Sequence, residues 1–147
     1  MAEDLKAIAR RTLEEILPNG DIDGFRAVVH PDCVNHDPPP GAPPGRDGMI
    51  QAMGMLKRGF SEPRFEIHQT ITEGDTVVID CTLHARHTGE FMGRGPTNQP
   101  IATRQVHIVR FQDGKIIEHK AVRDDLGLGR QLGIIPGPVA DPGAHSR

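Results

Sequence analysis

The chain has 147 residues, a formal net charge of −3 and 36% hydrophobic residues. These values predict one soluble globular domain with a real core, and the small negative charge gives no general attraction to nucleic-acid phosphates. The N-terminus is polar and helical in pattern, and no stretch resembles a signal peptide or a membrane span. We therefore expect a cytoplasmic protein that binds neither nucleic acid nor membrane.

The sequence contains no Trp and no Tyr, so no tyrosine hydroxyl can serve as an acid or an oxyanion donor. Two cysteines, Cys33 and Cys81, make no disulfide framework and are interpreted as small, reduced, buried residues. The sequence motifs of phosphate-binding loops, dinucleotide-binding folds and serine hydrolases are absent. This leaves general acid–base chemistry as the main catalytic possibility.

The first 60 residues predict three helices. Apolar residues recur at helical spacing over residues 5–17, until the breaker Pro18-Asn19-Gly20. Asp21 or Asp23 can cap a short second helix. A third helix opens at Asp47-Gly48 and turns Met, Ile, Leu and Phe side chains inward.

Between the second and third helices lies Asn35-His36-Asp37, followed by PPPGAPPG at residues 38–45. The prolines and glycines predict a stiff loop. Asn35, His36 and Asp37 at its start could reach a ligand, or the Asn and Asp side chains could form local turn hydrogen bonds. The residues leave both alternatives open.

From Arg64 the hydrophobic period becomes two, as in a strand, and a Gly- and Pro-rich stretch over residues 89–100 interrupts the strand pattern. The last two strand-like runs, Arg104–Phe111 and Lys115–Arg123, flank Asp113-Gly114 and predict a hairpin. Helices followed by antiparallel strands predict an α+β fold. We expect three N-terminal helices packed on a curved antiparallel sheet, which together form a cone around one deep apolar cavity.

We expect residues 1–135 to form this single domain and residues 136–147 to be a mobile tail, because the tail has turn residues and little to bury.

Cys81, His84 and His87 have a spacing typical of metal ligands. On a strand, however, Cys81 and His87 face one way and His84 the other, so the three cannot converge without a bulge. We expect no metal. His87 alone could be a polar group at the rim of the cavity or a surface residue.

Asp124 and Asp125 follow the last strand and precede a glycine-broken apolar segment. Apolar surroundings disfavour the charged form of a carboxylate and make it a useful base. We expect Asp124 to line the cavity as the catalytic group and Asp125 to lie outside, capping the segment that follows. A structural role for Asp124, holding loop amides, is the alternative.

His107 is the expected partner of Asp124 if the hairpin has a two-residue turn. Gln112 then opposes Lys115 and His107 opposes Lys120, which places Gln105, His107, Glu118, Lys120 and Asp124 on one face. A three-residue turn with a bulge would shift the register by one residue and turn His107 away from Asp124.

Three segments resemble the SnoaL-like polyketide cyclase family. DGKIIEHKAVRDDLGLGRQLG is similar to its C-terminal signature, HTGEFMGRGPTNQP to its glycine-rich loop, and GRDGMIQAMGMLKRGFSEPRFEIHQTITEGDTVV to its helix and hairpin. The resemblance covers residues 34–133.

This resemblance implies the nuclear-transport-factor-2-like cone fold and intramolecular aldol ring closure without a cofactor. The aspartate that acts as base and acid in the family corresponds to Asp124. Asn35, His36, His87, Phe91, Gln105 and Lys120 are the expected substrate contacts. Lys120 departs from the family pattern, which often has Trp there, and we expect it to alter the cavity wall.

Relatives of this fold include isomerases, hydroxylases and binding proteins, so the fold alone does not choose the reaction. A non-catalytic binder of a hydrophobic molecule and a cofactor-free hydroxylase or isomerase are the alternatives to a cyclase with a polyketide substrate. The helix-free face of the sheet predicts a homodimer.

Overall fold

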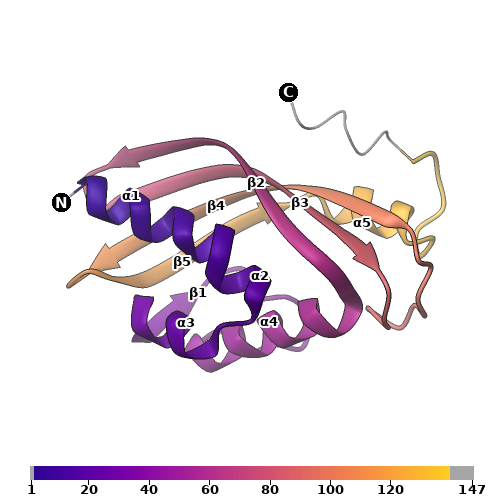
Figure 1. Ribbon diagram of the computed structural model, residues 1–147, viewed down its shortest axis with the longest axis horizontal. Coiled ribbons are helices and arrows are strands. Elements are labelled where there is room, and N and C mark those ends of the chain that lie inside the picture. Colours follow the sequence, from indigo (N-terminus) through magenta and orange to yellow (C-terminus); the bar gives the residue numbers. More distant parts are fainter. Residues whose placement is uncertain (1, 140–147) are drawn as a thin grey trace.

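The computed structural model describes residues 2–139, so most of the expected C-terminal tail, residues 140–147, lies outside the described part. The predicted α+β class is confirmed: helices pack on a five-stranded, mostly antiparallel sheet. Figure 1 shows the sheet arching over the N-terminal helices, with α5 at the end of the molecule far from the N-terminus. No helix within the described residues is long and apolar enough to cross a membrane.

The expected first helix is a continuous helical stretch that changes pitch. It comprises α1 (Ala2–Arg11), the π-helical turn η1 (Thr12–Ile16) and α2 (Leu17–Asn19), and it ends at Gly20 in the left-handed conformation. Glycine suits that position because it has no Cβ.

Three further helices follow. Asp21 caps α3 (Ile22–Val28) by accepting a hydrogen bond of 2.9 Å from the Gly24 amide, as predicted. The third helix is α4 (Arg46–Gly59), and α5 (Asp125–Gln131) is the short apolar element after the last strand.

The sheet has the order β1-β5-β4-β3-β2. Its strands are β1 (Val29–Asn35), β2 (Phe60–Glu73), β3 (Thr76–His87), β4 (Pro100–Gln112) and β5 (Lys115–Arg123). All neighbours are antiparallel except β1 and β5, which run parallel.

The short edge strand β1 was not predicted from the sequence. VHPDCVN contains a proline and no regular alternation, so its strand conformation depends on pairing with β5. Proline is tolerated because β1 lies at the edge of the sheet. The expected order of three helices and then strands was therefore wrong at this point, and the cause is a tertiary contact.

The predicted hairpin is confirmed, and an additional bulge changes which side chains face inward. Asp113 and Gly114 both have positive φ, and Gln112 pairs with Lys115 across a two-residue turn. Phe111 then pairs with Ile116 but Arg110 pairs with Glu118, so Ile117 is an extra residue. Beyond Ile117 the inward-facing positions of β5 change from even to odd residue numbers.

The bulge corrects the predicted position of Lys120. His107 pairs with Ala121 rather than with Lys120, and Lys120 is exposed, opposite Ile108 on the outer face of the sheet. His119 and Ala121 are buried on the inner face instead. Lys120 therefore forms no part of the cavity wall.

The core lies between the helices and the inner face of the sheet. Alternate residues of β3 and β4 are buried there with apolar residues of the helical layer. Its fully buried members include Val29, Val77, Ile79 and Cys81. A second, smaller cluster of Phe60, Ala85, Ile101 and Leu132 connects the sheet to α5.

Residues 88–99 form the loop between β3 and β4, and its first turn touches the end of α4. The backbone amides of Thr88 and Gly89 both donate to the Gly59 carbonyl. A Cβ at Gly89 would lie 1.9 Å from the Arg58 carbonyl oxygen. Only glycine allows this backbone approach.

We expect Gly89→Ala to lower the free energy of unfolding by about 1–3 kcal/mol, because the backbone must move away from α4. Gly95→Ala in the same loop is the matched control, since a Cβ there meets nothing within 4 Å. Urea denaturation of both variants measures the difference. Equal stability of the two variants would contradict the close approach.

Candidate functional site

The helices and the inner face of the sheet enclose a cavity of about 730 Å³. This volume suits a small organic molecule of several rings. Most of the wall is apolar and is supplied by Leu, Ile, Phe and Met side chains from every layer of the fold, including Leu13, Met53, Phe65, Leu83 and Leu132. The predicted apolar cavity is therefore present.

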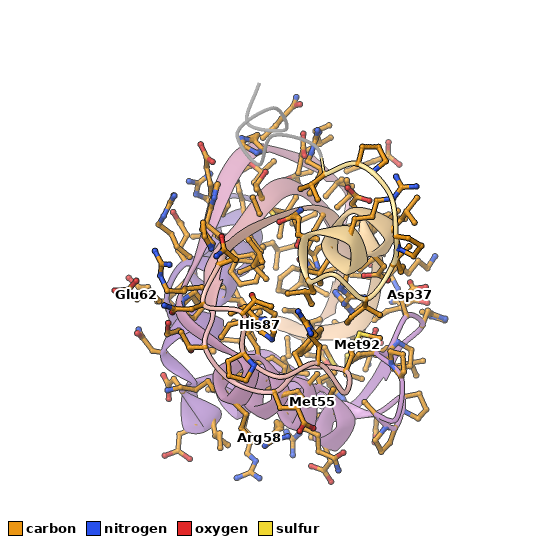
Figure 2. The ribbon with its side chains drawn as sticks, turned by 90° about the vertical axis from the view of Figure 1, so that its right-hand side faces the viewer. Asp37, Met55, Arg58, Glu62, His87 and Met92 are labelled. Atoms are coloured by element: carbon orange, nitrogen blue, oxygen red, sulfur yellow. The ribbon has the colours of Figure 1, made fainter. Side chains whose placement is uncertain are left out.

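The cavity reaches the end of the molecule that Figure 2 faces. Asp37 and Met92, both in its wall, lie on the side of α5 in this view, whereas Glu62 points outward on the opposite side. Phe91, an expected substrate contact, also lines the cavity and packs edge-on against Phe60 with ring centroids 4.9 Å apart.

Polar groups enter the cavity mainly from one strand. Thr103, Gln105 and His107 alternate along β4, all three are buried, and all three line the cavity. Successive members are separated by roughly 6.6 Å, the rise of two strand residues. The Thr103 hydroxyl is buried without a hydrogen-bond partner among the described residues.

Gln105 and His107 belong to a chain of four hydrogen-bonded side chains. His107 Nε2 lies 2.7 Å from Gln105 Oε1, and His107 Nδ1 lies 2.9 Å from Nε2 of His119. His119 Nδ1 then lies 2.8 Å from Oδ1 of Asn35. The chain crosses the sheet from β4 through β5 to the end of β1.

Asn35 and Asp37 anchor the far end of this chain. The Asp37 amide donates to Asn35 Oδ1 at 3.2 Å, and the Asp37 carboxylate accepts a hydrogen bond of 2.9 Å from the Ala121 amide. Asn35 is 4% exposed and lines the cavity. The local turn hydrogen bond is therefore present, and it holds Asn35 in the cavity wall.

Burial keeps the two histidines neutral. Desolvation is the largest cause that lowers the pKa of His119 to about 4, and the positive charge of Arg123 lowers it further. Burial and then His119 hold the pKa of His107 well below its ordinary value. The pair is therefore uncharged at neutral pH.

The two acids at the end of β5 are placed in the reverse of the expected way. Asp124 is the N-cap of α5, where its Oδ1 accepts a hydrogen bond of 2.9 Å from the Gly127 amide. Asp125 is exposed and lines the mouth of the cavity, together with Arg123. The expectation that Asp125 caps the helix is wrong because α5 begins one residue earlier than expected.

His36 and His87 do not occupy the expected ligand-binding positions. His36 lies outside the cavity wall, and its Nε2 is 2.6 Å from Glu118 Oε2, a carboxylate that also binds Arg110. His87 is fully buried, and its Nδ1 accepts a hydrogen bond from the Thr97 amide. His87 therefore holds the loop of residues 88–99 against the end of β3.

His119, Arg123 and Thr103 also line the cavity, and the sequence pattern did not indicate them. A two-residue turn alone predicts that His119 faces outward, and only the bulge at Ile117 turns it inward.

Within residues 2–139 no three His, Cys, Asp or Glu side chains cluster as metal ligands. Burial raises the pKa of the Cys33 thiol to about 11 and that of Cys81 to about 12.

Comparison with known proteins identifies close relatives. Residues 7–132 match the family model of SnoaL-like polyketide cyclases. The chain is 34% identical over 120 residues to a nogalonic acid methyl ester cyclase of Streptomyces nogalater, covering 78% of this chain and 87% of the relative. It is 31% identical over 139 residues to the aklanonic acid methyl ester cyclase AcmA of Streptomyces galilaeus, covering 90% and 92%.

A solved structure has a similar fold. AclR from Streptomyces galilaeus, a candidate hydroxylase, superposes with a TM-score of 0.82 at 27% identity, covering 94% of this chain and 86% of AclR. The nuclear-transport-factor-2-like cone that the sequence predicts is therefore the fold of this chain.

The depressed pKa of His119 predicts a loss of stability in acid. Its folded-state pKa of about 4 lies below the ordinary value of 6.5, so the unfolded chain takes up the proton first as the pH falls. The free energy of unfolding should drop between pH 6.5 and pH 4, by on the order of 3 kcal/mol from this residue. Urea denaturation at a series of pH values measures the slope.

His119→Gln should flatten this slope, whereas His30→Gln, which changes a histidine outside the cavity wall, should leave it unchanged. Identical slopes for His119→Gln and the unmodified protein would show that His119 is not the buried neutral group.

Proposed function

Because the chain belongs to the SnoaL-like polyketide cyclase family, we propose that it closes a ring on a polyketide methyl ester by intramolecular aldol condensation. The relatives are cyclases, which supports a cyclase-type enzyme. The methyl esters of nogalonic and aklanonic acids, named for these relatives, indicate the class of substrate to test.

The proposal rests on an apolar cavity whose few polar groups enter mainly from one strand. The cavity of about 730 Å³ can hold several fused rings, and Thr103, Gln105 and His107 reach it along β4. An apolar enclosure with fixed polar groups folds a flexible substrate and shields its reactive carbon from water.

Asp124 is the proposed general base. It occupies the family position, is half-buried at the end of β5, and lies between Arg123 and Asp125, which both line the cavity. Its hydrogen bond from the Gly127 amide orients the carboxylate through one oxygen. The cap therefore fixes the orientation of the Asp124 carboxylate at the end of β5.

In the proposed reaction Asp124 removes a proton from the carbon between the ester and a ketone. The resulting enolate carbon forms a bond to a second carbonyl carbon of the same molecule, and the new alkoxide takes the proton back from Asp124. The reaction forms one carbon–carbon bond and moves one proton within the same molecule, so it requires no cofactor.

The resemblance to AclR supports a cofactor-free hydroxylase as the second candidate. Such an enzyme consumes dioxygen, whereas aldol ring closure does not. An oxygen electrode with a quinone-type substrate distinguishes the two reactions.

We also propose that two copies of the chain associate through the outer face of the sheet. Val106 and Val122 pair across β4 and β5 on this face, Val122 is 73% exposed, and the N-terminal helices cover the opposite face. A second copy would remove this apolar pair from water.

We expect Asp124→Asn to lower the turnover of aklanonic acid methyl ester by about 100-fold or more, because it removes a general base. Asn caps a helix about as well as Asp, so the fold should persist. Ring closure is followed by liquid chromatography with mass spectrometry, and circular dichroism checks the fold.

Asp125→Asn is the matched control, and its turnover should stay within a few-fold of the unmodified protein. If Asp125→Asn abolishes turnover while Asp124→Asn retains it, the base is the neighbouring acid and the assignment to Asp124 fails.

The dimer predicts a mass of twice 16.0 kDa in gel filtration with light scattering. Val122→Glu should shift the protein to the monomer, because it places a charge in the apolar contact. Val139→Glu changes another exposed valine, outside the sheet, and should leave the mass unchanged. A monomer mass for the unmodified chain would refute the association.

A further inference from the structure

The chain of buried side chains from Asn35 to Gln105 has a direction, and Asn35 sets it. The Asp37 amide can only donate, so the Asn35 atom that it contacts is the oxygen. The same oxygen lies 2.8 Å from His119 Nδ1. Because two acceptors cannot share a hydrogen bond, His119 Nδ1 carries a proton.

The direction then passes to His107. A neutral His119 with its proton on Nδ1 has a lone pair on Nε2, which lies 2.9 Å from His107 Nδ1. His107 Nδ1 must therefore be the donor. A neutral His107 with its proton on Nδ1 in turn has a lone pair on Nε2, facing Gln105.

The charge of the pair decides how Gln105 is turned. If Gln105 Oε1 accepts from His107 Nε2, the three hydrogen bonds need three protons on four ring nitrogens, so one histidine is a cation. The amide group fills the same space when it is turned by 180°, and its nitrogen then donates to His107 Nε2. In that arrangement both histidines are neutral.

The surroundings favour the neutral arrangement. Both rings are buried, at 6% and 8% exposure, and the cation Arg123 lies beside them in the cavity wall. Arg123 and His36 disfavour a positive charge on His119, and Asp37 is the nearby acid that favours it. The Asp37 carboxylate is already bound to the Ala121 amide. A buried charge without a dedicated ion-pair partner is costly.

We propose that His119 is a positioning residue that holds His107 in the Nδ1–H tautomer and thereby turns the Gln105 carbonyl oxygen toward the cavity. Gln105 lines the cavity, so this oxygen is a fixed hydrogen-bond acceptor there. The site then selects molecules that present a hydroxyl group at this point, such as a phenol or an enol, over molecules that present a carbonyl or an ether oxygen.

This selection rests on the proposed function, because it assumes that the substrate binds in the cavity. The tautomer itself can be measured without turnover. The turnover of Asp124→Asn tests the proposed function, and the tautomer of His107 tests the role of His119. One proposal can therefore be refuted while the other stands.

Long-range proton–nitrogen NMR of protein labelled in histidine distinguishes the ring tautomers. At pH 7.5 we expect both His107 and His119 to carry their proton on Nδ1, although a free neutral histidine prefers Nε2. His119→Gln keeps an acceptor for His107 and should retain its Nδ1–H tautomer, whereas His119→Leu should release it to the Nε2–H form. His30→Gln should change neither ring.

An Nε2–H tautomer or a cation at His107 in the unmodified protein would overturn the inference. So would a His107 tautomer that stays the same in His119→Leu, because His119 would then not position it. Circular dichroism establishes that each variant is folded.

The ligand preference is tested with 2-naphthol and 2-methoxynaphthalene, which differ in the hydroxyl donor. The unmodified protein and His119→Gln should bind 2-naphthol about three- to tenfold more tightly, and His119→Leu should lose this preference. Equal affinity of the unmodified protein for both probes would refute the acceptor role of Gln105.

Discussion

The extra residue Ile117 in β5 is the constraint on which the site depends. Side chains of a strand alternate between two faces, so one unpaired residue exchanges the inward and outward sets for the rest of the strand. Without it, Glu118 and Lys120 would face the cavity. With it, His119 and Ala121 do, and the two charged residues lie on the outer side.

The bulge also explains why one cavity can be apolar and still hold a directional polar network. The register after Ile117 turns the side chain of His119 inward, where it contacts that of His107. The parallel pairing of β1 with β5 brings Asn35 to the other side of His119. Three strands thus supply one hydrogen-bonded chain whose members satisfy one another, as buried polar groups must.

The acid at the end of the same strand is held by a different interaction. Asp124 begins α5, and Gln131 at the end of this helix makes two hydrogen bonds of 2.9 Å with the backbone of Ala102 in β4. The short helix is therefore fixed to the sheet at both ends. This arrangement keeps Asp125 at the mouth of the cavity, while the histidine chain is buried in the wall.

The sequence by itself determined the α+β class, the Asp21 cap of α3, the Asp113-Gly114 turn and the family, because these depend on local periodicity and short motifs. It also named His107, Gln105, Asn35 and Phe91 as candidate site residues, and all four line the cavity. The tertiary structure alone decided the strand β1, the bulge at Ile117 and the inward turn of His119. These features follow from pairing between segments more than 80 residues apart, or from one residue of register, and local preference carries no signal for either.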